Sequence, residues 1–250
     1  FIPGDPDNSS LPVGGLEYVL ENTSTKPQEM IFSYHARNFL SWGKGVDAIK
    51  VMPHGFVLSQ AGTEAEPHLQ GDFAIFTDED SPKINYCWFR GGWFDSLTMV
   101  WNAIESGLMP QSPAVEKGAP GASIFIPVTL MPGDKKTIRI YTAWYVPCST
   151  LRIGEEPEDW NDNNVAPATL ALERADQGNY KPWYSSRFAG IDEVIDYLLT
   201  HYKTLREQTE KFTESFYRST LPSEVIEAVS ANLSILKSPT VMRQYDGRLW

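Results

Sequence analysis

The sequence predicts a mainly β protein, an antiparallel β-sandwich followed by helices. Three observations support this fold class. Short runs with apolar–polar alternation recur between residues 15 and 146, and Pro, Gly, Asn and Asp clusters separate them. The regular spacing of these runs argues against alternating β and α units. Beyond residue 185 the apolar residues instead recur at three- and four-residue spacing, which is typical of amphipathic helices.

Composition excludes several classes of protein. Hydrophobic residues make up 42% of the 250 residues, which is enough apolar surface for a folded core. The formal net charge of -11 repels phosphate backbones, so we expect no nucleic-acid partner. No apolar run approaches the about 20 residues that a spanning helix needs, so no transmembrane segment is expected. No signal peptide is present, and we expect any targeting segment to lie upstream of Phe1 or to be absent.

Alternation and turn residues predict the strands. They are expected at 15–23, 29–37, 48–52, 55–59, 72–77, 84–89, 122–130 and 137–146. A short polar connection joins the first two, which predicts that they are adjacent antiparallel partners. Pro132-Gly133-Asp134 joins the last two, which predicts a β-hairpin.

Helical spacing predicts three further elements. Leu97, Val100, Trp101 and Ile104 indicate a short amphipathic helix. The periodicity from residue 191 to about 216 indicates one long helix or two in series. Pro222 is expected at the start of another helix, because proline is tolerated in a first helical turn.

The segment 86–95 concentrates five aromatic residues, one arginine and two glycines. Such a cluster is typical of a core, an interface or a surface that stacks on sugars. Strand alternation predicts that Trp88 and Phe89 divide between core and surface. Gly91-Gly92 would let the chain turn or approach another surface closely. Arg90, Trp93 and Asp95 are therefore the candidates for a domain interface or for the rim of an active site.

Other chemically capable residues favour structural roles. His35 lies at the polar phase of its strand without a neighbouring partner, so we expect a cross-strand or surface hydrogen bond rather than catalysis. Cys87 and Cys148 lie in apolar runs, where we expect buried free thiols in preference to a disulfide.

Two acidic stretches carry oxygens that calcium prefers. Asp5, Asp7 and Asn8 lie in a Pro/Gly-rich turn without the full series of loop ligands. The acidic segment 155–164 has neither a glycine between ligands nor a closing glutamate. A plain turn and a solvated insertion are favoured over calcium, and no metal or cofactor is predicted.

Several short motifs resemble glycoside hydrolase family 116, which contains non-lysosomal glucosylceramidase and prokaryotic β-glucosidases and β-xylosidases. The motifs span nearly the whole chain. They are Ile-Pro-Gly-Asp at 2–5, Asn-Ser-Ser-Leu-Pro-Val at 8–13, Trp-Phe-Arg-Gly-Gly-Trp-Phe-Asp at 88–95, Ala-Trp-Tyr-Val-Pro at 143–147, Leu-Pro at 221–222, Ala-Asn-Leu at 231–233 and Asp-Gly-Arg-Leu-Trp at 246–250.

The resemblance implies a β-sandwich followed by linker helices and an (α/α)6 barrel. It places the sandwich at 1–185, the linker helices at 186–218 and the beginning of the barrel at 219–250. It also implies retaining hydrolysis of a β-glycoside by two carboxylates. Family members carry both carboxylates in the barrel, which places them downstream of Trp250. No catalytic residue is therefore assigned here, and the implied partners are a carbohydrate substrate, a β-glucoside or a related compound, and the chain's own downstream catalytic barrel.

Two other functions remain open at this point. One is a non-catalytic carbohydrate-binding β-sandwich module that uses Trp88, Trp93 and Trp101 as stacking platforms. The other is a purely structural domain that supports a barrel. The residues do not fix the compartment, and only the resemblance suggests a bacterial periplasmic or secreted protein.

Overall fold

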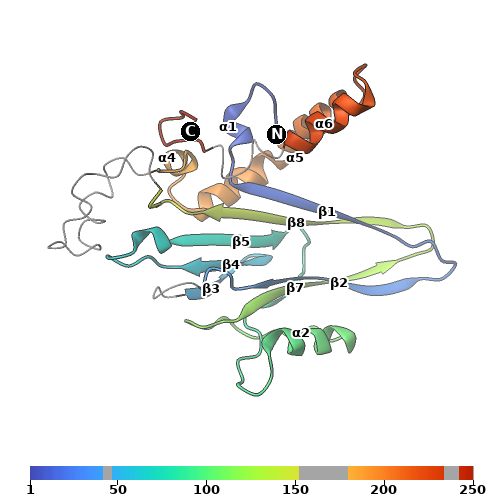
Figure 1. Ribbon diagram of the computed structural model, residues 1–250. Coiled ribbons are helices and arrows are strands. Elements are labelled where there is room, and N and C mark those ends of the chain that lie inside the picture. The colour runs from blue at the N-terminus through green and yellow to red at the C-terminus, as the bar shows by residue number, and fades with distance from the viewer. Residues whose placement is uncertain (42–46, 152–179, 234–241, 250) are drawn as a thin grey trace. The chain divides into compact units, whose positions relative to one another are not determined.

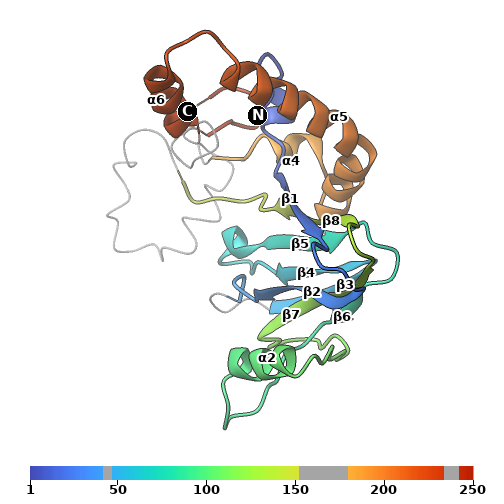
Figure 2. The ribbon, with the colours of Figure 1, turned by 90° about the vertical axis from the view of Figure 1, so that its right-hand side faces the viewer.

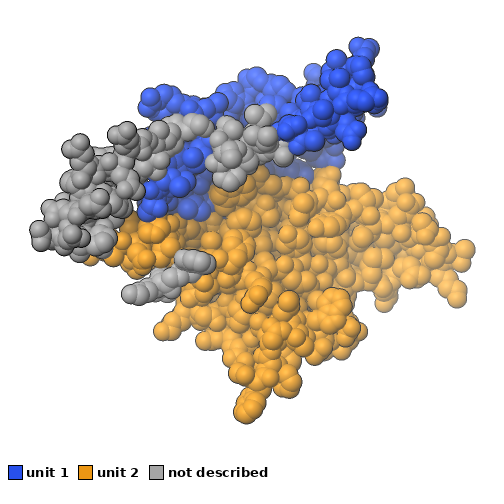
Figure 3. Space-filling model, viewed as in Figure 1, with its two compact units in different colours: residues 1–12, 145–250 blue, residues 13–144 orange. Residues whose placement is uncertain are grey.

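The computed structural model describes residues 1–41, 47–151, 180–233 and 242–249 (Figure 1). The chain divides into two compact units (Figure 3). One unit comprises residues 13–144 and contains the sheets. The other comprises residues 1–12 and 145–250, and its described residues are mostly helical.

The unit 13–144 is a sandwich of two sheets. Its strands are β1 (Val13–Glu21), β2 (Gln28–Arg37), β3 (Asp47–Met52), β4 (Gly55–Gln60), β5 (Gly71–Thr77), β6 (Lys83–Asn85), β7 (Gly121–Leu130) and β8 (Lys135–Tyr145). A five-stranded sheet has the order β1-β8-β5-β4-β3, and a three-stranded sheet has the order β2-β7-β6. A short 3₁₀ helix, η1 (Pro67–Leu69), precedes β5. The mainly antiparallel sandwich predicted from the alternation is confirmed.

The core lies between the two sheets, as the two-residue period requires. Strand β7 contributes every second residue, from Ala122 through Ile124 and Ile126 to Leu130, and all are buried. The five-stranded sheet contributes buried residues to the same core, including Phe56, Leu58, Ile138 and Ile140. The other phase of β7 faces away from this core and is available for a second layer.

Strand pairing corrects two predictions about neighbours. Strand β1 pairs with β8, from Val13↔Ala143 to Glu21↔Lys135, and not with β2. Strand β2 pairs with β7, so β7 and β8 belong to different sheets and do not form a hairpin. The turn residues correctly indicate where the chain reverses. They carry no information about which sheet receives the next strand, because that is decided by partners far along the chain.

Asn22 joins the β1–β2 connection to the β7–β8 connection, the two places where the chain passes from one sheet to the other. Its backbone N–H donates to Asp134 O at 3.0 Å, and its carbonyl accepts from Gly133 N at 2.8 Å. Its side-chain amide donates to Lys26 O and to Leu130 O, both at 2.9 Å. The residue is 3% exposed. One buried amide therefore satisfies carbonyls of both crossings.

The strand predicted at 84–89 ends early, at Asn85. The buried Asn85 side chain accepts hydrogen bonds from Cys87 N at 3.4 Å and from Ser112 N at 3.1 Å. Beyond it, Tyr86 N donates to Ser112 O instead of to a regular ladder. The local apolar pattern cannot distinguish this irregular extended segment from a strand. The helix predicted at 97–104 is confirmed as α2 (Ser96–Glu105).

The other unit contains α1 (Pro6–Ser9), α4 (Tyr184–Arg187), α5 (Ile191–Tyr217) and α6 (Ser223–Leu233). Helix α5 is one continuous helix, which decides between the two readings of its periodicity. Pro222 O accepts from Val225 N at 3.0 Å, which confirms its place at the start of α6. Among the described residues, no helix is both long and apolar enough to span a membrane.

Replacing Asn22 tests whether its hydrogen bonds between the two connections stabilise the sandwich. We expect Asn22→Ala to lower the free energy of unfolding by about 1–3 kcal/mol, because the buried hydrogen bond to Leu130 O and the partly buried one to Lys26 O are both lost. Urea denaturation followed by tryptophan fluorescence measures this change. The exposed neighbour Thr23 supplies the control, and Thr23→Ala should change stability little. Equal effects of the two substitutions would refute the role given to Asn22.

Candidate functional site

Trp88 anchors the segment 86–95 to the outer side of the three-stranded sheet. It is 2% exposed, its backbone N–H donates to Gly121 O at 3.0 Å, and its indole Nε1–H donates to Ser123 Oγ at 2.8 Å. A Cβ atom on Gly121 would lie 2.6 Å from the indole ring, so only glycine permits this packing. Trp88 is therefore not a sugar-stacking platform, which corrects one element of the binding-module hypothesis. The predicted division is confirmed, because Phe89 is exposed.

The residues that follow present large apolar side chains to solvent. Trp93 is 94% exposed, and Phe94, Leu97 and Trp101 are also exposed. The predicted apolar face of α2 therefore buries only Val100 completely. A tryptophan left almost fully in water is unusual, because its burial contributes strongly to stability and binding. These exposed residues, Phe89, Trp93, Phe94, Leu97 and Trp101, are called the aromatic segment below.

Asp95 is the N-cap of α2. Its carboxylate accepts from Thr98 Oγ1 at 2.6 Å, from Thr98 N at 2.8 Å and from Leu97 N at 3.2 Å. The bond from the Thr98 hydroxyl is the main cause that lowers the pKa of Asp95. The carboxylate thus fixes the direction in which α2 leaves the loop.

Arg90 is exposed and lies beside Gly118, where its Nη2 would be 3.7 Å from a Cβ atom. Gly118 lines a hollow of about 460 Å³ together with Arg37, Asn38 and Asp47. Asn38 Oδ1 is buried there without a hydrogen-bond partner among the described residues. The charge of Arg37 also contributes to the lowered pKa of Asp95. Arg90 and Asp95 are thus near this hollow, although no hydrogen bond or ion pair joins Arg90, Trp93 and Asp95 within the described ranges.

The two glycines in the loop differ in their surroundings. Neither has a positive φ, so the turn does not require glycine for its backbone angles. Gly91 lies under the ring of Phe89, where a Cβ atom would collide with it, whereas Gly92 has open space around it. Because the exposed ring of Phe89 can move aside, neither position strictly requires glycine.

A second, larger cavity of about 490 Å³ is lined by residues from the end of α2, β2 and β7. Figure 2 shows α2 beside the sheet that contains β2 and β7. The apolar lining of the cavity is Met30, Ile31, Ile104, Leu108, Phe125, Pro127 and Val128. Its polar lining is Glu29, Ser33 and Thr129, with Gly107 at the helix end.

The end of α2 shapes this cavity. Gly107 has φ +68, its N–H donates to Ile104 O at 2.9 Å, and Leu108 N donates to Ala103 O at 2.9 Å. These two bonds form a Schellman cap, in which glycine takes the left-handed conformation. The cap holds Ile104 and Leu108 at the cavity wall.

A partly buried hydrogen-bond network ends at Ser33, which lines the cavity. Trp88 Nε1–H donates to Ser123 Oγ, which lies 2.8 Å from His35 Nδ1, and His35 Nε2 lies 2.9 Å from Ser33 Oγ. Ser123 is fully buried, so its hydroxyl proton is satisfied only if it is donated to His35 Nδ1. His35 is then neutral and donates from Nε2 to Ser33. Burial lowers the pKa of His35, which agrees with this neutral state. The cross-strand role predicted for His35 is confirmed.

This network predicts acid sensitivity. The pKa of His35 is depressed in the folded state, so the unfolded chain binds more protons once the pH falls below about 6.5. The free energy of unfolding should therefore be greatest above that pH and decrease as the solution is made more acidic. Unfolding measured from pH 7.5 to 5 should show a shallower decrease for His35→Gln than for the unchanged chain. The matched control is His68→Gln in η1, which should retain the original slope; identical slopes for all three proteins would contradict the assignment.

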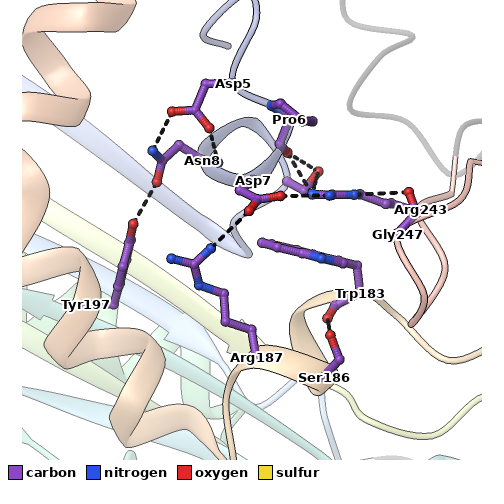
Figure 4. Close-up of polar contacts among 11 residues, drawn as sticks. Asp5, Pro6, Asp7, Asn8, Trp183, Ser186, Arg187, Tyr197, Arg243 and Gly247 are labelled. Atoms are coloured by element: carbon purple, nitrogen blue, oxygen red, sulfur yellow. Dashed lines mark hydrogen bonds and ion pairs between the residues drawn. The ribbon is translucent and has the colours of Figure 1, made fainter.

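The helical unit has its own cluster of charged and aromatic residues (Figure 4). Asp7 binds Arg243 Nη2 at 2.7 Å through Oδ1 and Arg187 Nη1 at 3.4 Å through Oδ2. The guanidinium of Arg243 lies over Trp183 at 4.1 Å, and that of Arg187 lies over Tyr197 at 4.9 Å. This arrangement ties the beginning of the chain to residues 183–187 and 243.

The same cluster explains the acidic turn at the beginning of the chain. Both oxygens of Asp5 accept hydrogen bonds from Asn8, which are the main causes that lower the pKa of Asp5. Asn8 Oδ1 in turn accepts from Tyr197 Oη at 2.8 Å. With Asp7 bound to two arginines, these side chains serve as caps and ion pairs rather than as a calcium shell. The segment 155–164 lies outside the described residues.

Arg243→Lys tests the cluster. Lysine keeps the charge but loses the planar fork that contacts Asp7 Oδ1 and Pro6 O and stacks on Trp183. We expect the amide protons of Ser9 and Ser10 to exchange several-fold faster with deuterium, because α1 loses its tether. Arg248→Lys is the control, since that side chain is exposed and pairs with its near neighbour Asp246. Unchanged exchange at both serines would refute the tether.

The two cysteines are free thiols, as expected. Cys87 is buried, and burial raises the pKa of its thiol. Cys148 is only partly buried, so full burial was predicted correctly for one of the two.

The partners within two groups of residues were not predicted. Ser33, His35 and Ser123 come together across strands, and the only sequence signal was the i, i+2 spacing of Ser33 and His35, which places both on one face. Arg243 is 236 residues away from its partner Asp7, a separation that local patterns cannot bridge.

The fold and the aromatic segment define the class: a β-sandwich module that presents large aromatic side chains on a loop and a short helix. The family model described as "beta-glucosidase 2, glycosyl-hydrolase family 116 N-term" matches residues 1–205. The chain belongs to glycosyl-hydrolase family 116 and carries its N-terminal domain. A comparison with curated proteins gives no match.

Proposed function

We propose that the chain is the N-terminal part of a retaining β-glycosidase that hydrolyses β-glucosides or related β-glycosides, including glucosylceramide-like substrates. The match of residues 1–205 to the N-terminal family model carries this proposal. Retaining hydrolysis needs two carboxyl groups about 5–5.5 Å apart, one as nucleophile and one as acid/base. The proposal assigns both to a catalytic barrel downstream of Trp250.

The proposed division assigns 1–185 to the β-sandwich domain, 186–218 to linker helices and 219–250 to the beginning of an (α/α)6 barrel. Helix α5 falls within the linker, and α6 falls at the first barrel helix. The burial of Ile191, Val194 and Leu198 in the first turns of α5 agrees with a linker fixed at its beginning.

The aromatic segment is proposed to contact the barrel or the rim of its active site. Trp93 is 94% exposed, and tryptophan is enriched among the residues that carry most of the energy of a binding interface. Arg90 would supply a charge beside the hollow at Gly118. Asp95 would act indirectly, since its cap aims α2 and thereby sets the position of Trp101.

Hydrolysis of p-nitrophenyl β-D-glucoside tests the proposal. The isolated chain 1–250 should release no p-nitrophenol, whereas the intact protein should release it and form the β-anomer of glucose first. In the intact protein, Trp93→Ala should lower kcat/KM by roughly 10- to 30-fold, the loss expected of a hot-spot contact. Val51→Ala, at another exposed apolar residue, should leave kcat/KM unchanged. Hydrolysis by 1–250 alone, or inversion of the anomer, would contradict the proposal.

A carbohydrate-binding module without catalysis is the second candidate. It is favoured by the exposure of Trp93 and Trp101 and by the polar hollow at Arg37, Asn38 and Asp47. Saturable quenching of tryptophan fluorescence by glucose or cellobiose in 1–250, lost in Trp93→Ala, would support this function. An intact protein that binds sugars but hydrolyses none would favour it over the glycosidase.

A further inference from the structure

We propose that the cavity behind α2 is a binding site for an uncharged amphiphile, a ligand with an aliphatic body and an oxygen that accepts a hydrogen bond. The inference concerns the cavity between α2, β2 and β7, and it does not depend on the glycosidase proposal. The cavity is distinct from the aromatic segment and from the hollow at Gly118.

The size and lining of the cavity suit a small ligand with an apolar body. Its volume of about 490 Å³ falls in the range of sites for small molecules. The side chains of Met30 and Val128 belong to the core between the sheets. The side chains that can face the cavity are therefore mainly aliphatic, Ile31, Ile104, Leu108 and Pro127, with one aromatic ring, Phe125. Such walls favour a ligand whose body is a short alkyl chain.

The sandwich leaves this wall open for a structural reason. The outward phase of β2 and β7 carries Ile31, Phe125 and Pro127 among polar residues, and α2 covers it only in part. Phe125 is buried beneath that cover, whereas Ile31 and Leu108 at the open end are 37% and 60% exposed. Exposed aliphatic side chains around a cavity gain contacts when an apolar ligand fills it.

The polar groups define the other end of the ligand. Ser33 Oγ accepts from His35 Nε2, so its own proton remains available as a donor toward the cavity that it lines. No other partner of Ser33 occurs in the ranges that the structure describes. A ligand hydroxyl, ether or carbonyl oxygen would complete the chain Trp88–Ser123–His35–Ser33. Glu29 also lines the cavity, and its carboxylate disfavours an anionic ligand such as a fatty-acid carboxylate.

Titration of the intact protein with 1-octanol, n-octyl β-D-glucoside below its micelle concentration, and octanoate at pH 8 tests the site. Methyl NMR of Ile31, Ile104 and Leu108 locates binding, and calorimetry gives Kd. We expect 1-octanol to bind saturably with shifts at these methyls, and octanoate to bind more weakly. Binding of the glucoside as well would assign the site to glycoside aglycones, and binding of the alcohol alone would assign it to free amphiphiles; either result supports the proposal.

Variants separate the cavity from other apolar surfaces. Ser33→Ala should weaken octanol binding about three- to tenfold, the loss of one hydrogen bond. Glu29→Gln should reduce the difference in Kd between octanol and octanoate. Ile104→Trp should abolish binding by filling the cavity, and Ile31→Trp, at a half-exposed strand position, repeats this test if the first variant does not fold.

Two controls address nonspecific adsorption. Val51→Trp adds apolar surface on β3, and Trp93→Ala removes it from the aromatic segment; neither should change binding. The proposal is overturned if octanol gives no saturable shifts, if octanoate binds equally well, or if Trp93→Ala abolishes binding while the cavity-filling variants retain it.

Discussion

The pairing of β1 with β8 and of β2 with β7 is the constraint on which the sandwich depends. Because each pair lies in a different sheet, the chain must cross between the layers at both connections. A crossing removes backbone groups from the ladders, and buried groups of this kind are costly unless they find partners. Asn22 supplies those partners with its backbone and its amide, so one residue keeps both crossings together.

In the same arrangement the two faces of β7 pack against different parts of the molecule. One phase of the strand, which includes Ile124 and Ile126, fills the core between the sheets. The other phase, which includes Ser123 and Phe125, receives Trp88 and lies under α2. The aromatic segment can therefore be anchored at Trp88 and still present Trp93 to solvent. The rigid sheet positions the loop, which is the usual relation between a scaffold and a functional surface.

Local patterns predicted most elements because periodicity and turn chemistry act over a few residues. The strand at 55–59, the helix at 97–104 and the start of α6 after Pro222 are examples. Neighbours in the sheets were predicted wrongly for β1 and β2, because alternation marks the buried face of a strand but not its partner. The candidate site was found in part. Aromatic density located Trp93, whereas the cap formed by Asp95 became evident only when its contacts with Thr98 were known.

The sequence by itself determined the fold class, the helical region beyond residue 185 and the family. Composition, periodicity and short motifs depend only on the residues and their order along the chain. Tertiary structure alone decided the assignment of strands to sheets, the burial of Trp88 against Gly121 and the meeting of Ser33, His35 and Ser123. It also decided the ion pair between Asp7 and Arg243. The physical reason is that hydrogen bonds and packing join residues by distance in space, and a chain folded into two layers brings together positions that its linear order keeps far apart.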